Sequence, residues 1–99
     1  MKSLWVDDLR LPPEGWDWAK TSKEAIDLLA EAYFSNDPYI QVSLDHDLGG
    51  EDTTRPVVLW MCEFDAFPQV CYAHTADPVG LEWLEGMLKR YGPGLTRLA

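Results

Sequence analysis

The sequence is poor in basic residues and has no long apolar segment. Eight Lys and Arg stand against 17 Asp and Glu, so the formal net charge is −9. This balance excludes binding to duplex nucleic acid through an extended basic face, because such binding needs Lys and Arg to neutralise phosphates. No stretch approaches the roughly 20 apolar residues that cross a bilayer, and the start MKSLWVDD lacks the apolar run of a signal peptide. We therefore expect a cytoplasmic protein that makes no contact with a membrane.

Cysteine is also scarce. Cys62 and Cys71 are the only two, and their spacing fits neither a CxxC motif nor a zinc ribbon. In the cytoplasm both stay reduced, so we interpret them as small buried hydrophobic residues. The acidic balance leaves two kinds of partner open. A small phosphate-containing ligand can be held through a metal ion, and a protein with a basic surface can dock on the acidic one.

The chain has enough apolar material for one domain. It has 99 residues, of which 46% are hydrophobic and 12% are aromatic. This length and composition are typical of a single globular unit. We predict one domain over residues 1–91 and a C-terminal tail over residues 92–99, because Gly92-Pro93-Gly94 ends the last helical pattern.

Short apolar runs alternate with helical patterns along the chain. The first run, residues 2–6, stops abruptly at Asp7-Asp8, as a buried strand does when it delivers polar side chains to one edge of a sheet. Two later runs also stop at acidic or histidine-containing segments. The expected strands cover residues 2–6, 16–20, 39–44 and 69–73.

The strongest helix signal is a capping box at Thr21 to Glu24, followed by apolar residues at helical spacing. The expected helices cover residues 22–34, 55–65 and 79–91. Strands that alternate with helices predict an α/β fold with a mainly parallel sheet of about four strands, covered by helices on both faces. The loop over residues 9–15 is short for a parallel crossover. The strand at 16–20 therefore pairs either in parallel, after a crossover made of bare loop, or antiparallel.

In such a sheet, ligands bind beyond the carboxyl ends of the strands. The side chains that follow three strand ends should therefore meet at one edge. Several carboxylates in a partly dry pocket repel one another unless a cation neutralises them, and hard oxygen ligands favour Mg²⁺ or Mn²⁺. An imidazole that titrates near neutrality can act as a general acid or base beside a metal-polarised phosphate. The predicted catalytic residues are His46, His74 and Asp47.

An Asp pair after the first strand, an Asp after a later strand and a Thr after the next one resemble the pattern of response-regulator receivers. The segments LWVDD, VSLDHD and YAHTA stand at those places. The chain departs from that pattern where a proline loop replaces the first helix. It also ends before a fifth strand, and no Lys stands at a matching strand end. A phosphate-accepting signalling role therefore ranks last.

The sequence is more similar to the cyclic-phosphate-processing receiver domains, in LWVDDLRLPPEGW, SLDHDLGG and HTADPVG, over roughly residues 4–80. This resemblance implies a truncated receiver-like (flavodoxin-like) three-layer sandwich. It also implies a metal-dependent, phosphoesterase-like activity on RNA ends or cyclic nucleotides. The resemblance to response-regulator receivers implies that the metal ligands are Asp7, Asp8 and Asp45 and that Thr75 contacts the phosphate. Arg10 is the nearest cation for a second phosphate oxygen.

Each of these residues also has a purely structural interpretation. An acid of the first pair can cap the following loop, His46 can be a solvated turn residue, and His74 and Thr75 can be turn residues before Asp77. We interpret Asp77 itself as a turn or helix cap, and Trp16 and Trp18 as core or loop anchors. The competing function is a non-catalytic, small acidic interaction or inhibitor protein, for example a phage-encoded protein that counteracts host defence.

Overall fold

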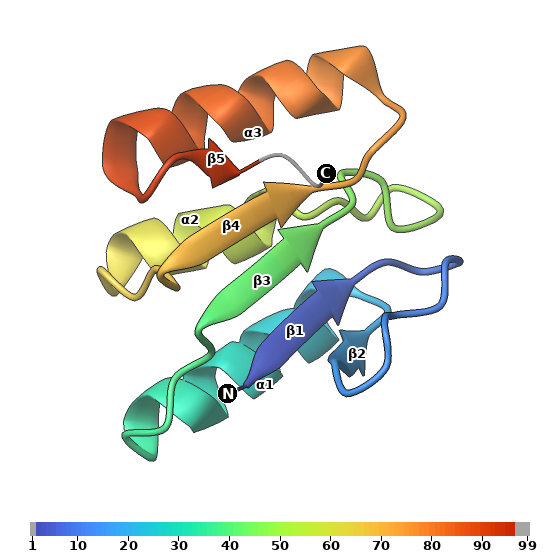
Figure 1. Cartoon of the computed structure of the whole chain (residues 1–99). Helices are drawn as coiled ribbons and strands as arrows, with labels where there is room; N and C mark the ends of the chain where they lie inside the picture. The colour runs from blue at the N-terminus through green and yellow to red at the C-terminus, as the bar shows by residue number, and fades with distance from the viewer. Residues whose placement is uncertain (1, 97–99) are drawn as a thin grey trace.

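The computed structural model describes residues 2–96 as a parallel sheet of five strands with three helices (Figure 1). The strands are β1 (Ser3–Val6), β2 (Asp17–Ala19), β3 (Gln41–Leu44), β4 (Val70–Ala73) and β5 (Leu95–Thr96), and the helices are α1 (Ser22–Phe34), α2 (Arg55–Glu63) and α3 (Pro78–Tyr91). The strand order is β2-β1-β3-β4-β5, and every neighbouring pair is parallel. This is the flavodoxin-like order, so the predicted receiver-like α/β class is confirmed.

The connection from β1 to β2 is a loop, and the two strands are nevertheless parallel. Leu4 lies opposite Asp17, and Val6 lies opposite Ala19. A hydrogen bond joins the two ends of the loop: Trp18 Nε1, on β2, donates to the carbonyl of Asp7, just after β1, at 2.7 Å. Of the two pairings that the sequence left open, the parallel one with a bare loop crossover is therefore correct.

The sheet has one strand more than the sequence indicated. Leu95 pairs with Cys71 across β4 and β5, and its side chain packs against the main core. The expectation that the chain ends before a fifth strand is thus wrong. A strand of two residues carries too little pattern to be recognised, and its place depends on the neighbour that α3 brings alongside. The rest of the predicted tail, residues 97–99, lies outside the described residues.

Both helix caps that the sequence indicated are present. Thr21 Oγ1 accepts a hydrogen bond from the Glu24 amide at 3.1 Å, so α1 begins at the predicted residue. Asp77 is the N-cap of α3, where Oδ1 accepts from the Val79 amide at 3.1 Å. The interpretation of Asp77 as a helix cap is therefore confirmed. Within residues 2–96, no helix is long and apolar enough to cross a bilayer.

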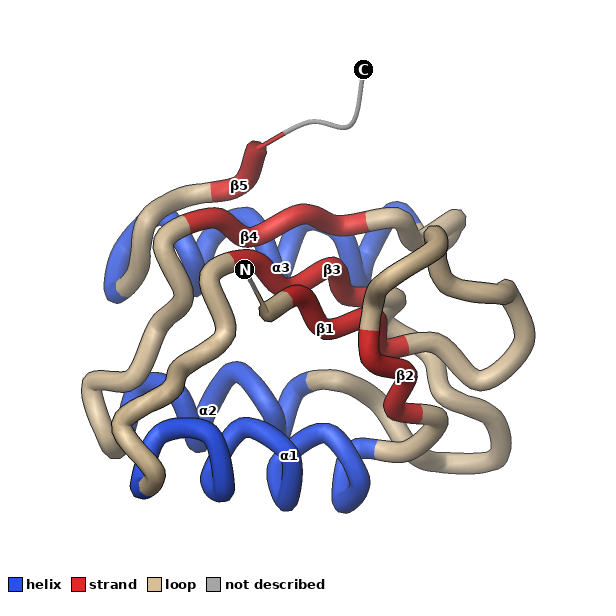
Figure 2. The backbone as a smooth tube through the Cα atoms, turned by 60° about the horizontal axis from the view of Figure 1, so that its bottom comes forward, coloured by secondary structure: helices blue, strands red, loops and turns tan. Residues whose placement is uncertain are grey.

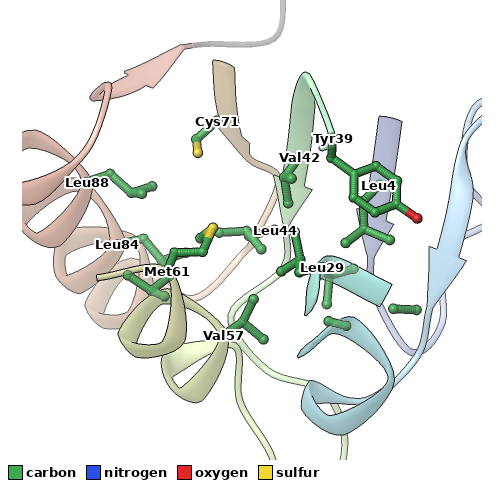
Figure 3. Close-up of a cluster of buried hydrophobic side chains, with 14 of the residues drawn as sticks. Leu4, Leu29, Tyr39, Val42, Leu44, Val57, Met61, Cys71, Leu84 and Leu88 are labelled. Carbon is green, nitrogen blue, oxygen red and sulfur yellow. The ribbon is translucent and has the colours of Figure 1, made fainter. Parts of the chain in front are cut away.

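All three helices pack on the same face of the sheet (Figures 1 and 3). Figure 2 shows α1 and α2 side by side beneath it. The alternate strand residues that face the helices are apolar, and their partners come from all three helices. Fully buried members of this core include Leu4, Val42, Leu44, Val57, Met61, Leu84 and Leu88.

The second helical layer that the sequence predicted is absent from residues 2–96. Its absence follows from the chain path, because the crossover from β1 to β2 has no helix to lay on the other face. That face carries Ser3, Trp5, Gln41, Ser43 and Tyr72, the strand residues that alternate with the core. Trp16 reaches over it from the loop and packs edge to face on Trp5, with ring centroids 5.9 Å apart. The loop-anchor interpretation of Trp16 is therefore confirmed.

Both cysteines are free thiols in the structure. Cys71 is fully buried in the core, and burial raises the pKa of its thiol to about 12. Cys62 is half-buried on α2, where burial raises its thiol pKa as well. The interpretation of the cysteines as apolar packing residues fits these environments.

Candidate functional site

Three carboxylates converge at the carboxyl edge of the sheet. Asp7, Asp8 and Asp45 each offer an oxygen, and these oxygens lie within 4.8 Å of one another. They follow β1 and β3, which are neighbours in the sheet. An open cavity of about 290 Å³ lies over them. It is lined by Asp8, Leu9, Arg10, Asp45, Asp47, Gly49, Thr75, Ala76 and Asp77.

Asp7 forms the buried floor of this site. Its Oδ1 accepts hydrogen bonds from the amides of Leu9 at 2.8 Å and Arg10 at 3.1 Å. Burial alone would raise the pKa of this carboxyl, but these two amides and His74 together hold it below its usual value. Asp7 is therefore an ionised group, and it also shapes the loop after β1. The loop-capping interpretation of the acid pair therefore holds for Asp7.

Asp45 has the opposite tendency. Burial raises its pKa, and the negative charge of Asp7 adds to that effect, while the Thr75 hydroxyl opposes it. A carboxylate that is held near another buried carboxylate is stabilised by a cation between them. The carboxylates at the acidic edge therefore repel one another, and a divalent ion between them would reduce this repulsion.

Asp8 is held close to the loop that follows β3. A Cβ on Gly49 would lie 2.9 Å from Asp8 Oδ2, and Gly49 has a φ of +86°. Both facts require glycine at this position, because a side chain would push the loop away from the acid. The loop thus closes over the acidic edge and leaves room for the carboxylate.

His74 lies beneath the cavity in a chain of hydrogen-bonded groups. Its Nε2 is 3.0 Å from Asp7 Oδ2, and its Nδ1 is 2.7 Å from Ser43 Oγ. The ring stacks on Trp5 with centroids 3.8 Å apart and planes 6° from parallel. Burial lowers the pKa of His74, although Asp7 opposes that shift. The neutral ring therefore donates from Nε2 to Asp7 and accepts at Nδ1 from Ser43.

Arg10 and Thr75 stand at the rim of the cavity. The Arg10 Nη1 donates a hydrogen bond to the carbonyl of His74 and lies 3.9 Å from Asp7 Oδ2. Its side chain is half exposed and is among those that line the cavity. Thr75 Oγ1 accepts from the Asp77 amide at 3.1 Å, as expected of a turn residue, and it also lines the cavity.

His46 belongs to a second cluster. Its Nδ1 lies 3.0 Å from Asp47 Oδ1 and 3.5 Å from Asp77 Oδ2. Its Nε2 accepts a hydrogen bond from Arg55 Nε at 2.9 Å, so the ring proton is on Nδ1. The ring is only 5% exposed. A Cβ on Gly80 would lie within 2.7 Å of its atoms, so α3 rests directly on the imidazole.

The structure thus divides the predicted residues into two groups. Seven of them line or underlie the cavity at the acidic edge: Asp7, Asp8, Arg10, Asp45, Asp47, His74 and Thr75. His46 does not line the cavity, while its neighbour Asp47 does, with a side chain that is 61% exposed. The solvated-turn interpretation of His46 does not hold, because the ring is buried.

Sequence reasoning did not identify Ser43, Arg55 or Gly80. Ser43 is fully buried on β3 and reaches His74 on β4, which is 31 positions away in the chain. A serine within an apolar run was the available signal for it. Arg55 and Gly80 contact His46 only because α2 and α3 begin at the same edge. No local sequence pattern predicts these contacts with His46.

The donor set fits a hard divalent cation. The three carboxylates supply only oxygens, and the cavity above them has room for water ligands, which Mg²⁺ retains. The His46 cluster fits less well. The permanent charge of Arg55 is hydrogen-bonded to the same imidazole, so a second cation on Nδ1 would be repelled.

A flavodoxin-like parallel sheet with acids at its carboxyl edge defines the receiver-like class of proteins. The family model described as Cyclic-phosphate processing Receiver domain matches residues 2–90. Because this match covers most of the chain, the protein belongs to that family, and the resemblance seen in the sequence is confirmed. A comparison with curated proteins gives no match.

Proposed function

We propose that the protein is a metal-dependent phosphoesterase that opens cyclic phosphates of RNA ends or nucleotides. The convergence of Asp7, Asp8 and Asp45 beneath an open cavity carries the proposal. Membership of the cyclic-phosphate processing family supports the substrate class. In this reaction a water oxygen bonds to phosphorus while one ring P–O bond breaks.

The three carboxylates are the proposed ligands of Mg²⁺ or Mn²⁺. When bound, such an ion would polarise the phosphate and neutralise the charge that develops on its oxygens. The chain contributes the geometry. The amides of Leu9 and Arg10 and the ring of His74 fix Asp7, and Gly49 leaves space for Asp8. Groups that orient a ligand in this way commonly affect metal affinity by about 10- to 100-fold.

Arg10 and Thr75 are the proposed phosphate-binding groups. Both line the cavity, and a guanidinium and a hydroxyl are suitable donors to non-bridging oxygens. Asp47 is the proposed general base, because it is the exposed carboxylate whose oxygen is held by the Nδ1–H of His46. It takes the proton of the attacking water, and solvent in the open cavity protonates the leaving oxygen.

We assign the two histidines to positioning rather than to direct proton transfer. Both rings are nearly buried, and all four of their ring nitrogens have partners within the chain. His74 orients a metal-site acid, and His46 orients the base. The sequence predicted that both histidines are catalytic. We propose instead that they contribute to the reaction indirectly, His74 by orienting Asp7 and His46 by orienting Asp47.

The test is an assay of a nucleoside 2′,3′-cyclic phosphate with Mg²⁺, with Mn²⁺ and with EDTA. We expect turnover that EDTA removes and that falls by at least about 100-fold in Asp8→Asn, since a metal contributes several kcal/mol of transition-state stabilisation. Asp27→Asn, which removes an exposed carboxylate from α1, is the matched control. Absence of turnover with either metal would overturn the proposal.

The alternative function, an acidic interaction protein, is favoured by one observation. Aromatic rings gather at the carboxyl ends of α1 and α2, where Phe34 is 69% and Phe64 is 39% exposed and their centroids are 6.1 Å apart. Exposed aromatic residues of this kind are typical of interfaces. Under this alternative, which includes inhibition of a host-defence protein, Phe34→Ala would abolish partner binding and Asp8→Asn would not.

A further inference from the structure

A second hollow runs along α3, beginning next to the acidic cavity. It has a volume of about 520 Å³, and the residues that define it include Arg55, Glu82, Trp83, Gly86, Arg90 and Tyr91. The positions on α3 recur every three or four residues, so they form one stripe of the helix. We call this hollow the α3 groove. It starts at Val79, whose amide is hydrogen-bonded to Asp77, a residue of the acidic cavity.

The α3 groove concentrates positive charge and aromatic surface in a chain that is otherwise acidic. Arg55 and Arg90 are two of only eight basic residues, against 17 acidic ones. The guanidinium of Arg55 lies over the ring of Trp83 at 4.9 Å, and that of Arg90 lies over Tyr91 at 5.3 Å. Glu82 is the one carboxylate that also lines the groove.

Both guanidinium groups have donors to spare. Within residues 2–96, Arg55 uses only its Nε, which donates to His46, and its terminal nitrogens form no hydrogen bond or ion pair. In the same part of the chain Arg90 forms none either, and its side chain lies at an exposed position. Arginine donors that carboxylates leave free, next to aromatic faces, bind phosphates and stack on bases.

We infer that the α3 groove binds the strand of a single-stranded RNA whose 2′,3′-cyclic phosphate end occupies the acidic cavity. This inference rests on the proposed function and names its substrate class, RNA ends rather than free cyclic nucleotides. The groove is short, which agrees with the exclusion of an extended basic face. The Arg55 side chain joins the two hollows, because it touches both Trp83 and the His46 that holds Asp47.

The experiment compares a cyclic mononucleotide with a short single-stranded RNA that ends in a 2′,3′-cyclic phosphate. We expect the KM for the RNA to be lower by about fivefold or more, the effect of stacking one base. Binding of the same RNA, followed by fluorescence anisotropy, should weaken with salt with a log–log slope of about −1.4, as expected for two phosphate contacts.

Two variants test the groove, each with a reason to fold. Arg90→Glu reverses a charge at an exposed position and should weaken RNA binding by about tenfold, whereas Lys89→Glu makes the same charge change one position outside the groove and should have no effect. Gly86→Leu places a side chain in the groove. A Cβ there meets no atom within 4 Å, so the fold should tolerate it while RNA binding is lost.

The outcomes separate this inference from the proposed function. RNA binding that is lost in Arg90→Glu and Gly86→Leu but kept in Lys89→Glu supports the groove, even if no cyclic phosphate is opened. Turnover with equal KM values for the two substrates overturns the groove and leaves the proposed function intact. Displacement of the RNA by a polyglutamate peptide at equal charge concentration also overturns it, because the groove would then be an unselective anion site.

Discussion

The two histidines of the acidic edge have similar burial and opposite surroundings. His74 lies between a carboxylate, Asp7, and a hydroxyl, Ser43. His46 lies between carboxylates and a guanidinium, that of Arg55. A hydroxyl can rotate to accept a proton from Nδ1, whereas a guanidinium can only donate. Both partners of His74 can therefore accept hydrogen bonds from its ring, whereas the Nε2 of His46 serves as the acceptor for Arg55.

This difference shows why the two rings serve different purposes. His74 follows β4, and its ring contacts Trp5 on β1, Ser43 on β3 and Asp7 at the end of β1, so the ring is held by the sheet and orients an acid at its edge. Around His46 the contacts come from the first residues of α2 and from α3, including Gly80. The first turns of α2 and α3 therefore pack on His46. We expect replacement of this residue to lower the free energy of unfolding more than it lowers the turnover rate.

Gly80→Ala is the change that tests this packing most severely. The added methyl group would lie within 2.7 Å of the His46 ring, and overpacking of a well-filled site commonly costs 1–3 kcal/mol. We expect a loss of about 3 kcal/mol in the free energy of unfolding, measured by urea denaturation.

Gly86→Ala is the matched control in the same helix. Its Cβ would meet nothing within 4 Å, so the helix should gain about 0.5–1 kcal/mol from the better helix former. The double variant His46→Ala/Gly80→Ala should recover part of the loss. Equal effects of Gly80→Ala and Gly86→Ala would show that α3 does not rest on the imidazole.

Stabilisation by an added metal ion should distinguish the Asp7, Asp8 and Asp45 cluster from the His46 cluster. An ion at a hundredfold excess over its dissociation constant should stabilise the fold by about 2.7 kcal/mol, which raises the Tm by roughly 10 °C or more. We expect this shift with Mg²⁺ or Mn²⁺ in the wild type and in His46→Ala, and its loss in Asp8→Asn. If the Tm shift persists in Asp8→Asn and is absent in His46→Ala, the ion binds at the His46 cluster instead.

The parts of this picture that local patterns encode were predictable. The capping box at Thr21 placed the start of α1, and apolar runs that stop at acids placed three strand ends at one edge. What could not be predicted depends on contacts between distant segments. The hydrogen bond from Ser43 to His74 needs β3 and β4 to be neighbours, and that from Arg55 to His46 needs the register of α2.

The prediction of helices on both faces of the sheet was wrong for a related reason. Alternation of strands and helices predicts helices on both faces, and one crossover without a helix is enough to leave a face open. The proline loop was recognised as a loop, but its effect on the layer count follows only from the direction in which each crossover runs.

Thr21→Ala tests whether a change distant from both histidines leaves the site untouched. It removes the hydroxyl that caps α1 and should cost about 1 kcal/mol of unfolding free energy. Cyclic-phosphate turnover by the folded variant should equal that of the wild type. A folded Thr21→Ala protein with reduced turnover would show that the functional edge extends to α1.

The smallest expected effect is a tilt in the pH dependence of stability, measured in EDTA. Burial lowers the pKa of His74, so between its folded pKa and the unfolded value of about 6.5 the unfolded chain binds more protons. This contribution is complete above about pH 6.5 and is lost as the pH falls through that window. His74→Gln should flatten this part of the profile, and an unchanged slope would contradict the assignment.

Asp45 should tilt the profile the other way at lower pH. Burial raises its pKa, so just above the unfolded value of 3.8 the folded chain binds more protons than the unfolded chain. Stability therefore falls as the pH rises through this window. Asp45→Asn should remove that fall in EDTA, while Asp27→Asn should not.

The shortness of β2 has a consequence for association between chains. This strand is one outer edge of the sheet and has only three residues, Asp17–Ala19, of which Asp17 is exposed. Lys20 follows it directly, and charged residues at a sheet edge discourage the addition of a foreign strand. The strands with the most continuous apolar sequence, β1 and β4, are paired on both sides. A concentrated solution of the folded protein should therefore resist the edge-to-edge pairing that begins fibril growth.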